Sequence, residues 1–166
     1  MSAHLTIRPC SPDDLIAAID LLMLSAEQHF YPDMDDAARA AFLQENSLAK
    51  ALWLQQQGYV YLAAWLGKRF AGFISISPAA HIHQLFVVDA LQKTGIGRTL
   101  LDAAIGAVAA AYPTAQVTVY ASNNAIGFYA RNGFQRTSET LYWYGSPYNP
   151  MSLVLATARA PALARG

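Results

Sequence analysis

The stretch that decides the fold runs from Leu85 to Arg98 and reads LFVVDALQKTGIGR. An apolar run typical of a buried strand leads through a short loop into two glycines, and a helical pattern follows them. The first amides of a helix have no partner within it, and the helix dipole adds positive charge there. Glycines let an anion approach this backbone, and Lys93 and Arg98 add further positive charge. The stretch therefore predicts an anion site between a strand and a helix.

Three alternatives compete with this interpretation of the glycines. The dinucleotide fingerprint needs a third glycine where this chain has Leu100. The Walker phosphate loop needs the pattern G-x-x-x-x-G-K-[ST], which the sequence lacks. A glycine turn that only reverses the chain remains open on these residues alone. The choice depends on the rest of the sequence.

Strand and helix patterns extend on both sides of the glycine turn. The expected strands cover residues 4–8, 59–66, 69–76, 81–88, 116–121, 141–144 and 151–155, and the last two are expected to pair. A polar turn at Gly67-Lys68 predicts a hairpin between the second and third of these strands. The expected helices begin at the N-cap Ser11, span about 36–56, run from the glycines to Pro113, and cover 124–131.

Composition indicates one globular domain, which we expect at residues 1–157 with a mobile tail at 158–166. The chain has 166 residues, of which 54% are hydrophobic and 13% charged, and this excludes a disordered chain. Lys+Arg and Asp+Glu both total 11, so no excess of positive charge favours nucleic acid. One cysteine and four scattered histidines predict neither an internal disulfide nor a metal site. With no membrane-length apolar run and no signal peptide, we expect a cytoplasmic protein without a membrane partner.

Two motifs together identify a family. The acetyl-CoA signature [QR]-x-x-G-x-[GA] is met by Gln92 to Gly97. One helix and one strand later, a second signature, A-x-x-F-Y-x-x-x-G-F, is met by Ala125, Phe128, Tyr129, Gly133 and Phe134. Ile7-Arg8-Pro9, Gly72-Phe73-Ile74 and Pro150-Met151 also agree. Over about residues 5–155 the chain thus resembles the Gcn5-related N-acetyltransferase (GNAT) superfamily.

The resemblance implies an α/β (α+β) fold that binds acetyl-CoA. The expected sheet is mixed and mostly antiparallel, has six to seven strands flanked by about four helices, and splays apart at its centre. Acetyl-CoA is expected in that opening, with its pantetheine on the backbone of Phe86, Val87 and Val88. Its pyrophosphate is expected at the glycine turn, which comprises Gln92, Lys93, Thr94, Gly95, Ile96, Gly97, Arg98 and Thr99. Many relatives carry Asn where this chain has Ser122, so we expect Asn124 to contact the cofactor and leave Ser122 and Asn123 open.

The resemblance also implies residues for proton transfer. Tyr129 occupies the family's tyrosine position near the CoA sulfur, and a phenol with a pKa near 10 stays protonated and able to donate. Packing against Phe128 is the alternative role. His81 and His83 share one face of a strand, and the pair resembles the His-x-His strand of arylalkylamine N-acetyltransferases. We expect them to take the amine proton, with His83 preferred; a hydrogen-bonded structural pair is the alternative.

The acceptor pocket is the least determined part of the prediction. Candidates at the end of the first helix and in the C-terminal strands are Glu27, His29, Phe30, Tyr31, Tyr142 and Tyr144, each with packing as the alternative role. The expected function is acetyl-CoA-dependent N-acetylation of a small-molecule amine by direct attack in a ternary complex. Acetylation of protein or peptide amines and a non-catalytic acyl-CoA sensor are the alternatives. Monomer and homodimer both remain open.

Overall fold

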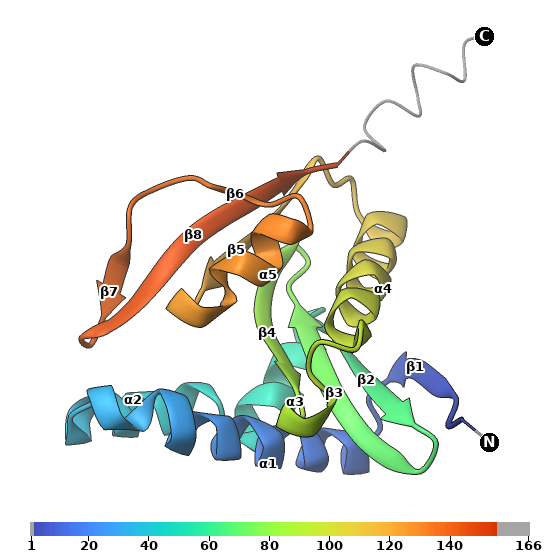
Figure 1. Cartoon of the computed structure of the whole chain (residues 1–166), viewed down its shortest axis with the longest axis horizontal. Coiled ribbons are helices and arrows are strands. Elements are labelled where there is room, and N and C mark those ends of the chain that lie inside the picture. Colours follow the sequence, from blue (N-terminus) through green and yellow to red (C-terminus); the bar gives the residue numbers. More distant parts are fainter. Residues whose placement is uncertain (1, 156–166) are drawn as a thin grey trace, which may run out of the picture.

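A computed structural model describes residues 2–155 of the chain (Figure 1). Over these residues eight strands join in the order β1-β2-β3-β4-β5-β8-β6, and β7 pairs with β8. The strands are β1 (Leu5–Pro9), β2 (Val60–Leu66), β3 (Arg69–Ile76), β4 (His81–Val87), β5 (Gln116–Ala121), β6 (Gln135–Arg136), β7 (Leu141–Trp143) and β8 (Ser146–Val154). The α-helices are α1 (Pro12–His29), α2 (Asp36–Glu45), α3 (Leu48–Gln56), α4 (Ile96–Ala111) and α5 (Ile126–Arg131). Three short 3₁₀ turns are η1 (Tyr31–Asp33), η2 (Asp89–Leu91) and η3 (Asn123–Ala125).

The sheet opens between β4 and β5, its one parallel pair among the described strands. Only His81 and Ile82 of β4 pair with β5, opposite Thr118 and Val119. Beyond these residues, neither strand has a partner on the side that faces the other. This confirms the predicted mixed, mostly antiparallel sheet that splays at its centre.

A register shift next to the opening changes the direction of β4. Ser75 of β3 pairs with Gln84, but the next residue, Ile76, pairs with Ile82. His83 is therefore an extra residue in β4, as in a β-bulge. Bulges bend a strand and redirect side chains, so this one sets how His83 stands at the opening.

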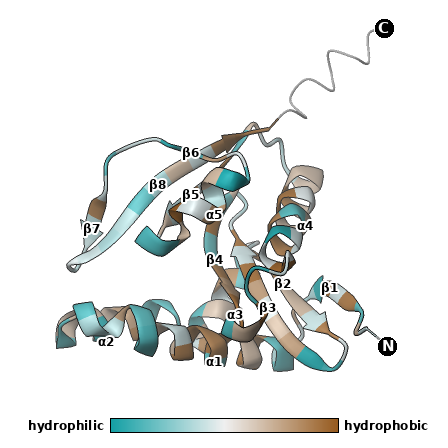
Figure 2. Cartoon of the chain, viewed as in Figure 1, coloured by the Kyte–Doolittle hydropathy of each residue, from teal (hydrophilic) through white to brown (hydrophobic). Residues whose placement is uncertain are grey.

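Helices cover the two faces of the sheet in separate clusters. On one face α4 and α5 pack on the central strands, with Leu100, Leu101 and Tyr129 in the core. On the other face α1 and α3 cover β2 and β3 around Leu22 and Phe73. Figure 2 shows hydrophobic residues gathered in β2, β3 and β4, whereas α2 mixes hydrophilic and hydrophobic residues.

Local signals explain where the helices begin. Ser11 caps α1 in a capping box with Asp14: its Oγ accepts from the Asp14 amide, and the Asp14 carboxylate accepts from the Ser11 amide. Asp14 is buried and bonded to Arg8 at 3.1 Å, which helps to hold its pKa below the ordinary value despite burial. Gly58 follows α3 with φ of +93°, a conformation that favours glycine.

Two predictions about elements are wrong. The helix expected at 36–56 is two helices, because Asn46 ends α2 and the Ser47 hydroxyl then caps α3. The strand expected at 141–144 does not pair with 151–155. Instead β7 pairs with Ser146–Tyr148 at the start of β8, and the later part of β8 pairs with β5 and β6. These differences, with the missed strand β6, give eight strands and five α-helices over residues 2–155 rather than six to seven and four.

Part of the predicted organisation lies outside the described residues. This holds for the tail at 158–166 and for residues 156 and 157 of the predicted domain. Among residues 2–155, no helix has the length and apolar character needed to cross a membrane. The same residues contain no group of three or more His, Cys, Asp or Glu side chains suited to hold a metal ion.

Candidate active site

The glycine turn presents free amides at the start of α4. Gly95 is the N-cap, with φ of +90° and no atom within 4 Å of the position that a Cβ would take. Within the described chain, no backbone carbonyl accepts from the amides of residues 93–98. The first amide with a helical acceptor is that of Thr99, 3.0 Å from the Gly95 carbonyl. The turn is therefore an open, amide-lined anion site, and it fits the diphosphate of coenzyme A.

The two glycines have different roles. A Cβ on Gly97 would lie 3.1 Å from the Phe128 ring, so the absence of a side chain there lets α4 pack on α5. Gly95 instead faces open space and needs its positive φ. Of the two, only Gly95 borders room for an anion.

Several predicted cofactor side chains are used by the turn itself. The Gln92 amide donates to the Val87 carbonyl at 3.2 Å, and the Thr94 hydroxyl donates to the Leu91 carbonyl. Thr99 donates to the Gly95 carbonyl with both its amide and its hydroxyl, so it offers neither group to a ligand. Ile96 is buried in the core. The exposed cations are Lys93 and Arg98, and Arg98 lies 3.9 Å from Asp102.

The edge of β4 offers fewer free groups than predicted. The Val88 amide donates to Ala71, and its carbonyl accepts from Leu91, so Val88 has no free backbone group for pantetheine. Paired and free residues alternate along an antiparallel edge. The backbone amide of Val87 therefore points away from β3 and toward the opening, whereas that of Phe86, opposite Phe73, points toward β3. Of the three predicted residues, Val87 is the one whose amide faces the opening.

Tyr129 lies on α5 and is buried, with 5% of its surface exposed. Its ring packs edge-on against Phe128 and Phe134, with centroids 5.1 and 5.2 Å away. Burial raises the pKa of the Tyr129 phenol above its ordinary value, so the hydroxyl keeps its proton at neutral pH. The ring is therefore part of the core, and the role of proton donor stays a prediction.

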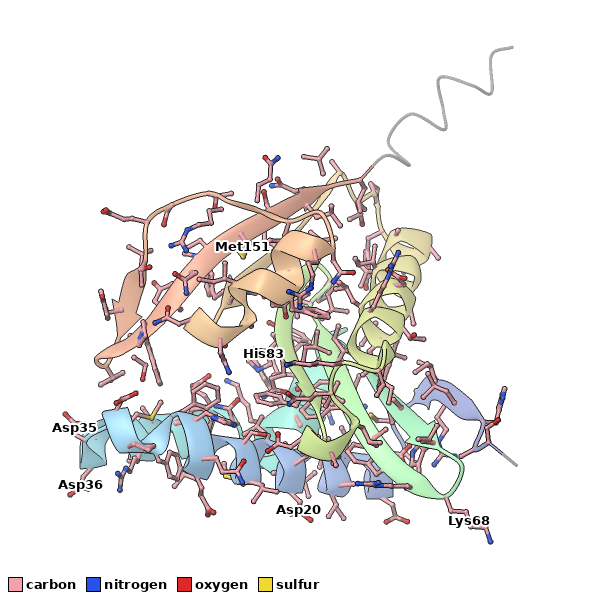
Figure 3. The ribbon with its side chains drawn as sticks, in the orientation of Figure 1. Asp20, Asp35, Asp36, Lys68, His83 and Met151 are labelled. Atoms are coloured by element: carbon pink, nitrogen blue, oxygen red, sulfur yellow. The ribbon has the colours of Figure 1, made fainter. Side chains whose placement is uncertain are left out.

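His83 is a neutral imidazole with an unused nitrogen. Figure 3 places it beside β4 at the centre of the molecule. Its Nε2 is buried and has no hydrogen-bond partner among the described residues. Its ring meets that of Tyr59 edge-on at 5.9 Å. Burial, with a smaller contribution from His81, lowers the pKa of His83 to about 4.

His81 stands apart from His83 in its surroundings. Its Nδ1 lies 2.7 Å from Thr118 Oγ1 of β5, and its ring packs on Tyr120. Burial lowers its pKa as well. It lines a pocket of about 330 Å³ on β5 and β8, together with Thr118, Val119, Tyr120, Thr137, Ser138, Leu141, Tyr148, Pro150 and Met151.

A second pocket, of about 270 Å³, lies between the end of α1, the loop after β5, and the start of β8. Its lining residues are His29, Phe30, Asp33, Ser122, Asn123, Asn124, Ser146 and Pro147. We call it the acceptor pocket because it contains residues that the sequence predicted to bind the acceptor. Two predicted acceptor residues, His29 and Phe30, therefore lie in it. Tyr31 packs instead on Phe42, and Glu27, Tyr142 and Tyr144 are exposed and line neither pocket.

The buried Asn149 organises the loop after β5. Its side-chain amide donates to the Ala121 carbonyl and to Asn123 Oδ1, both at 2.9 Å, and its oxygen accepts from Arg136. Ser122 and Asn124 bond to each other. All three candidates, Ser122, Asn123 and Asn124, line the acceptor pocket, with Asn123 held in place by Asn149.

Sequence reasoning missed Asp33, Ser146, Pro147 and Asn149. Asp33 and Ser146 lie far apart in the sequence, and no local pattern marks either residue. Cys10 plays no part in this site: burial raises the pKa of its thiol to about 12, so the reactive thiolate is disfavoured.

Comparisons with known proteins agree with this geometry. Residues 25–155 match the family model described as an acetyltransferase (GNAT) domain. The chain matches no curated protein sequence. The structure is similar to a GCN5-related N-acetyltransferase from Rhodopseudomonas palustris, with 26% identity and a TM-score of 0.74 over 93% of this chain and 98% of that chain.

Two structures that contain coenzyme A are also similar in fold. One is the PaiA N-acetyltransferase of Thermoplasma acidophilum, with 21% identity and a TM-score of 0.74 over 92% of this chain and 99% of that chain. The other is an aminoglycoside 6′-N-acetyltransferase, with 15% identity and a TM-score of 0.67 over 90% of this chain and 96% of that chain.

Proposed function

The chain belongs to the GNAT acetyltransferase family, whose acetyl donor is acetyl-CoA, and on this premise we propose that it acetylates a small-molecule amine by direct attack in a ternary complex. The observation that carries this proposal is the size of the acceptor pocket, about 270 Å³. Sites for small molecules usually measure about 300–1,000 Å³, so this pocket suits a compact acceptor. An extended peptide needs a long groove or a free strand edge, whereas this pocket is a compact space between the end of α1, the loop after β5 and the start of β8.

Backbone groups of the chain hold the donor in this proposal. The amides of Gly95 to Arg98 bind the diphosphate, and the Val87 amide binds the part of the donor that lies along β4. Acetyl-CoA, when bound, supplies an acetyl group activated as a thioester. A fixed amide near Val87 would also stabilise negative charge that develops on the acetyl oxygen during transfer.

His83 takes the amine proton. A neutral imidazole with a free, buried Nε2 can accept a proton, which a protonated imidazole cannot. Its pKa of about 4 means that the proton is not retained. We propose that the proton then passes by water toward His81, whose pocket gives a separate route to solvent.

Tyr129 gives a proton to the departing sulfur. Its raised pKa keeps the phenol protonated at neutral pH, at which His83 is neutral. An acid and a base with pKa values moved in opposite directions are a common basis for proton transfer in enzymes. The two groups come from α5 and β4.

The test compares acceptors by the release of the CoA thiol. We expect compact amines to have higher kcat/KM than peptides with free N-termini or lysines. A peptide acetylated tenfold more efficiently than every small amine would overturn the proposal. Ser146→Leu should fill the acceptor pocket and abolish turnover while leaving CoA binding intact. The matched control, Ser138→Leu, makes the same change in the His81 pocket and should retain acceptor binding.

A further inference from the structure

Charge is divided unevenly between two parts of the chain, an acidic side (residues 9–38) and a cationic side (residues 93–136). Residues 9–38 contain no Lys or Arg but seven of the 11 acidic residues: Asp13, Asp14, Asp20, Glu27, Asp33, Asp35 and Asp36. Residues 93–136 have the reverse balance, with Lys93, Arg98, Arg131 and Arg136 against Asp102. The cationic side is the one that meets the anionic donor. The acidic side supplies the end of α1 and η1, which border the acceptor pocket.

Asp33 is the one carboxylate among the residues that line the acceptor pocket. Within residues 2–155 it takes part in no ion pair. The nearby Arg39 donates to the Tyr31 carbonyl at 2.8 Å and lies over the Tyr31 ring. The other acids of the segment have different places: Asp35 caps α2, and Figure 3 shows Asp35 and Asp36 at the outer end of α2 and Asp20 on α1.

Two further groups in the pocket can receive a cation. Ser146 Oγ is buried without a hydrogen-bond partner among the described residues, although it borders the pocket. The half-buried ring of Phe30 lines the same space and offers an aromatic face. Asp33, Ser146 and Phe30 thus provide a negative charge, a hydroxyl and an aromatic ring in one cavity.

We infer that the acceptor is a small molecule with a second cationic group, which Asp33 binds while the other amine reacts. This inference rests on the proposed function. A carboxylate beside the reacting amine would hold its proton and oppose attack, because attack needs the neutral amine. The charge of Asp33 is useful toward a cation that stays charged, away from the acetyl group. The substrate class is therefore a compact diamine rather than a simple monoamine.

Binding is measured separately from transfer. Titration calorimetry of the full chain saturated with CoA compares 1,4-diaminobutane with butylamine, which has the same carbon chain and one charge. We expect the diamine to bind at least about tenfold more tightly, as a hydrogen bond between charged groups would give. Equal affinities for the two ligands would overturn the inference.

The variant Asp33→Asn tests whether Asp33 causes the tighter binding of the diamine. The variant should weaken diamine binding at least about tenfold and leave butylamine within about twofold. Asp36→Asn is the matched control, because it removes a neighbouring charge that does not line the pocket. If both variants reduce affinity equally, the general acidity of the segment and not Asp33 holds the cation, and the inference is wrong.

Turnover then distinguishes the two proposals. If the diamine binds preferentially but no amine is acetylated, the proposed transfer fails and the inference about binding stands. If amines are acetylated and the diamine has no advantage in KM over the monoamine, the inference fails and the proposed function stands. A diamine KM that rises in Asp33→Asn, with kcat unchanged, supports both.

Discussion

The wall at the end of β4 and the start of α4 is made of backbone groups, whereas the facing wall is made of side chains. In the first, the donor wall (residues 86–98), the amides of residues 93–98 have no backbone acceptor within residues 2–155, and polar side chains such as Gln92 bond within the turn. In the second, the acceptor wall (His29, Phe30, Asp33, Ser146 and Pro147), residues from two distant segments meet around one pocket. A backbone wall can recognise the part of the donor that never changes. A side-chain wall can vary with the acceptor while the fold stays the same.

His83 belongs to neither wall, and its titration is the largest effect that we expect. Burial lowers its pKa to about 4 from an unfolded value near 6.5. Between these values the unfolded chain binds a proton that the folded chain does not, so the free energy of unfolding falls as the pH falls, by at most about 3 kcal/mol. His83→Gln should lose less stability between pH 7 and pH 4 in urea unfolding.

A matched control separates His83 from other histidines. His4→Gln changes an exposed histidine and should keep the wild-type pH dependence. The pKa of His81 is also lowered, so His81 contributes to the pH dependence of the free energy of unfolding in the wild type and in both variants. If His83→Gln follows the wild-type curve, the imidazole is not held neutral by the fold.

Tyr129→Phe tests whether the Tyr129 hydroxyl takes part in acetyl transfer. We expect kcat to fall about 100-fold, as for the loss of a general acid, with the affinity for CoA unchanged. Tyr61→Phe is the control, since it removes the hydroxyl of another buried tyrosine, in the cluster under α1. A kcat within about threefold of wild type would make Tyr129 a packing residue.

Sequence patterns predicted the glycine turn and most of the fold for a local reason. The glycine pair, the strand before it and the helix after it lie within one short stretch, and the periodicity of β5 gave its bounds, Gln116–Ala121. The break between α2 and α3 was missed because Asn46 and Ser47 interrupt an apolar period that continues on both sides. The pairing of β7 depends on a turn in which Tyr144 has φ of +47°, a conformation that its residue type does not indicate.

Of the acceptor wall only His29 and Phe30 were predicted, because tertiary packing brings the other residues to them. Asp33 shares a pocket with Ser146 and Pro147 only once the β7–β8 turn lies against η1. The bulge that places His83 arises from the register between β3 and β4, which period-two alternation along one strand does not reveal. Aromatic side chains alone were a poor guide, since Tyr142 and Tyr144 are 68% and 56% exposed.

Gly95→Ala tests whether the donor wall depends on backbone conformation. Its φ of +90° is unfavourable for alanine, by about 1–2 kcal/mol, so relaxation of the turn should weaken CoA binding about tenfold. Gly106→Ala is a close control: it lies in the same helix, also has open space around a Cβ, and has no positive φ. It should preserve CoA affinity and add up to about 1 kcal/mol of stability. Equal losses of affinity in both variants would contradict a conformational role for Gly95.

The smallest effect that we expect is that of side-chain charge on the affinity of the donor wall for CoA, and Arg98→Gln measures it. The guanidinium is 74% exposed and lies 3.9 Å from Asp102, so water and salt screen its attraction for the donor. We expect CoA affinity to fall about two- to threefold at low ionic strength and to match wild type near 1 M salt. Arg69→Gln, on the exposed β2–β3 turn, is the control and should leave affinity unchanged. A loss of tenfold or more that persists in high salt would mean that side chains, and not amides, hold the diphosphate, and the two walls would then recognise their ligands in the same way.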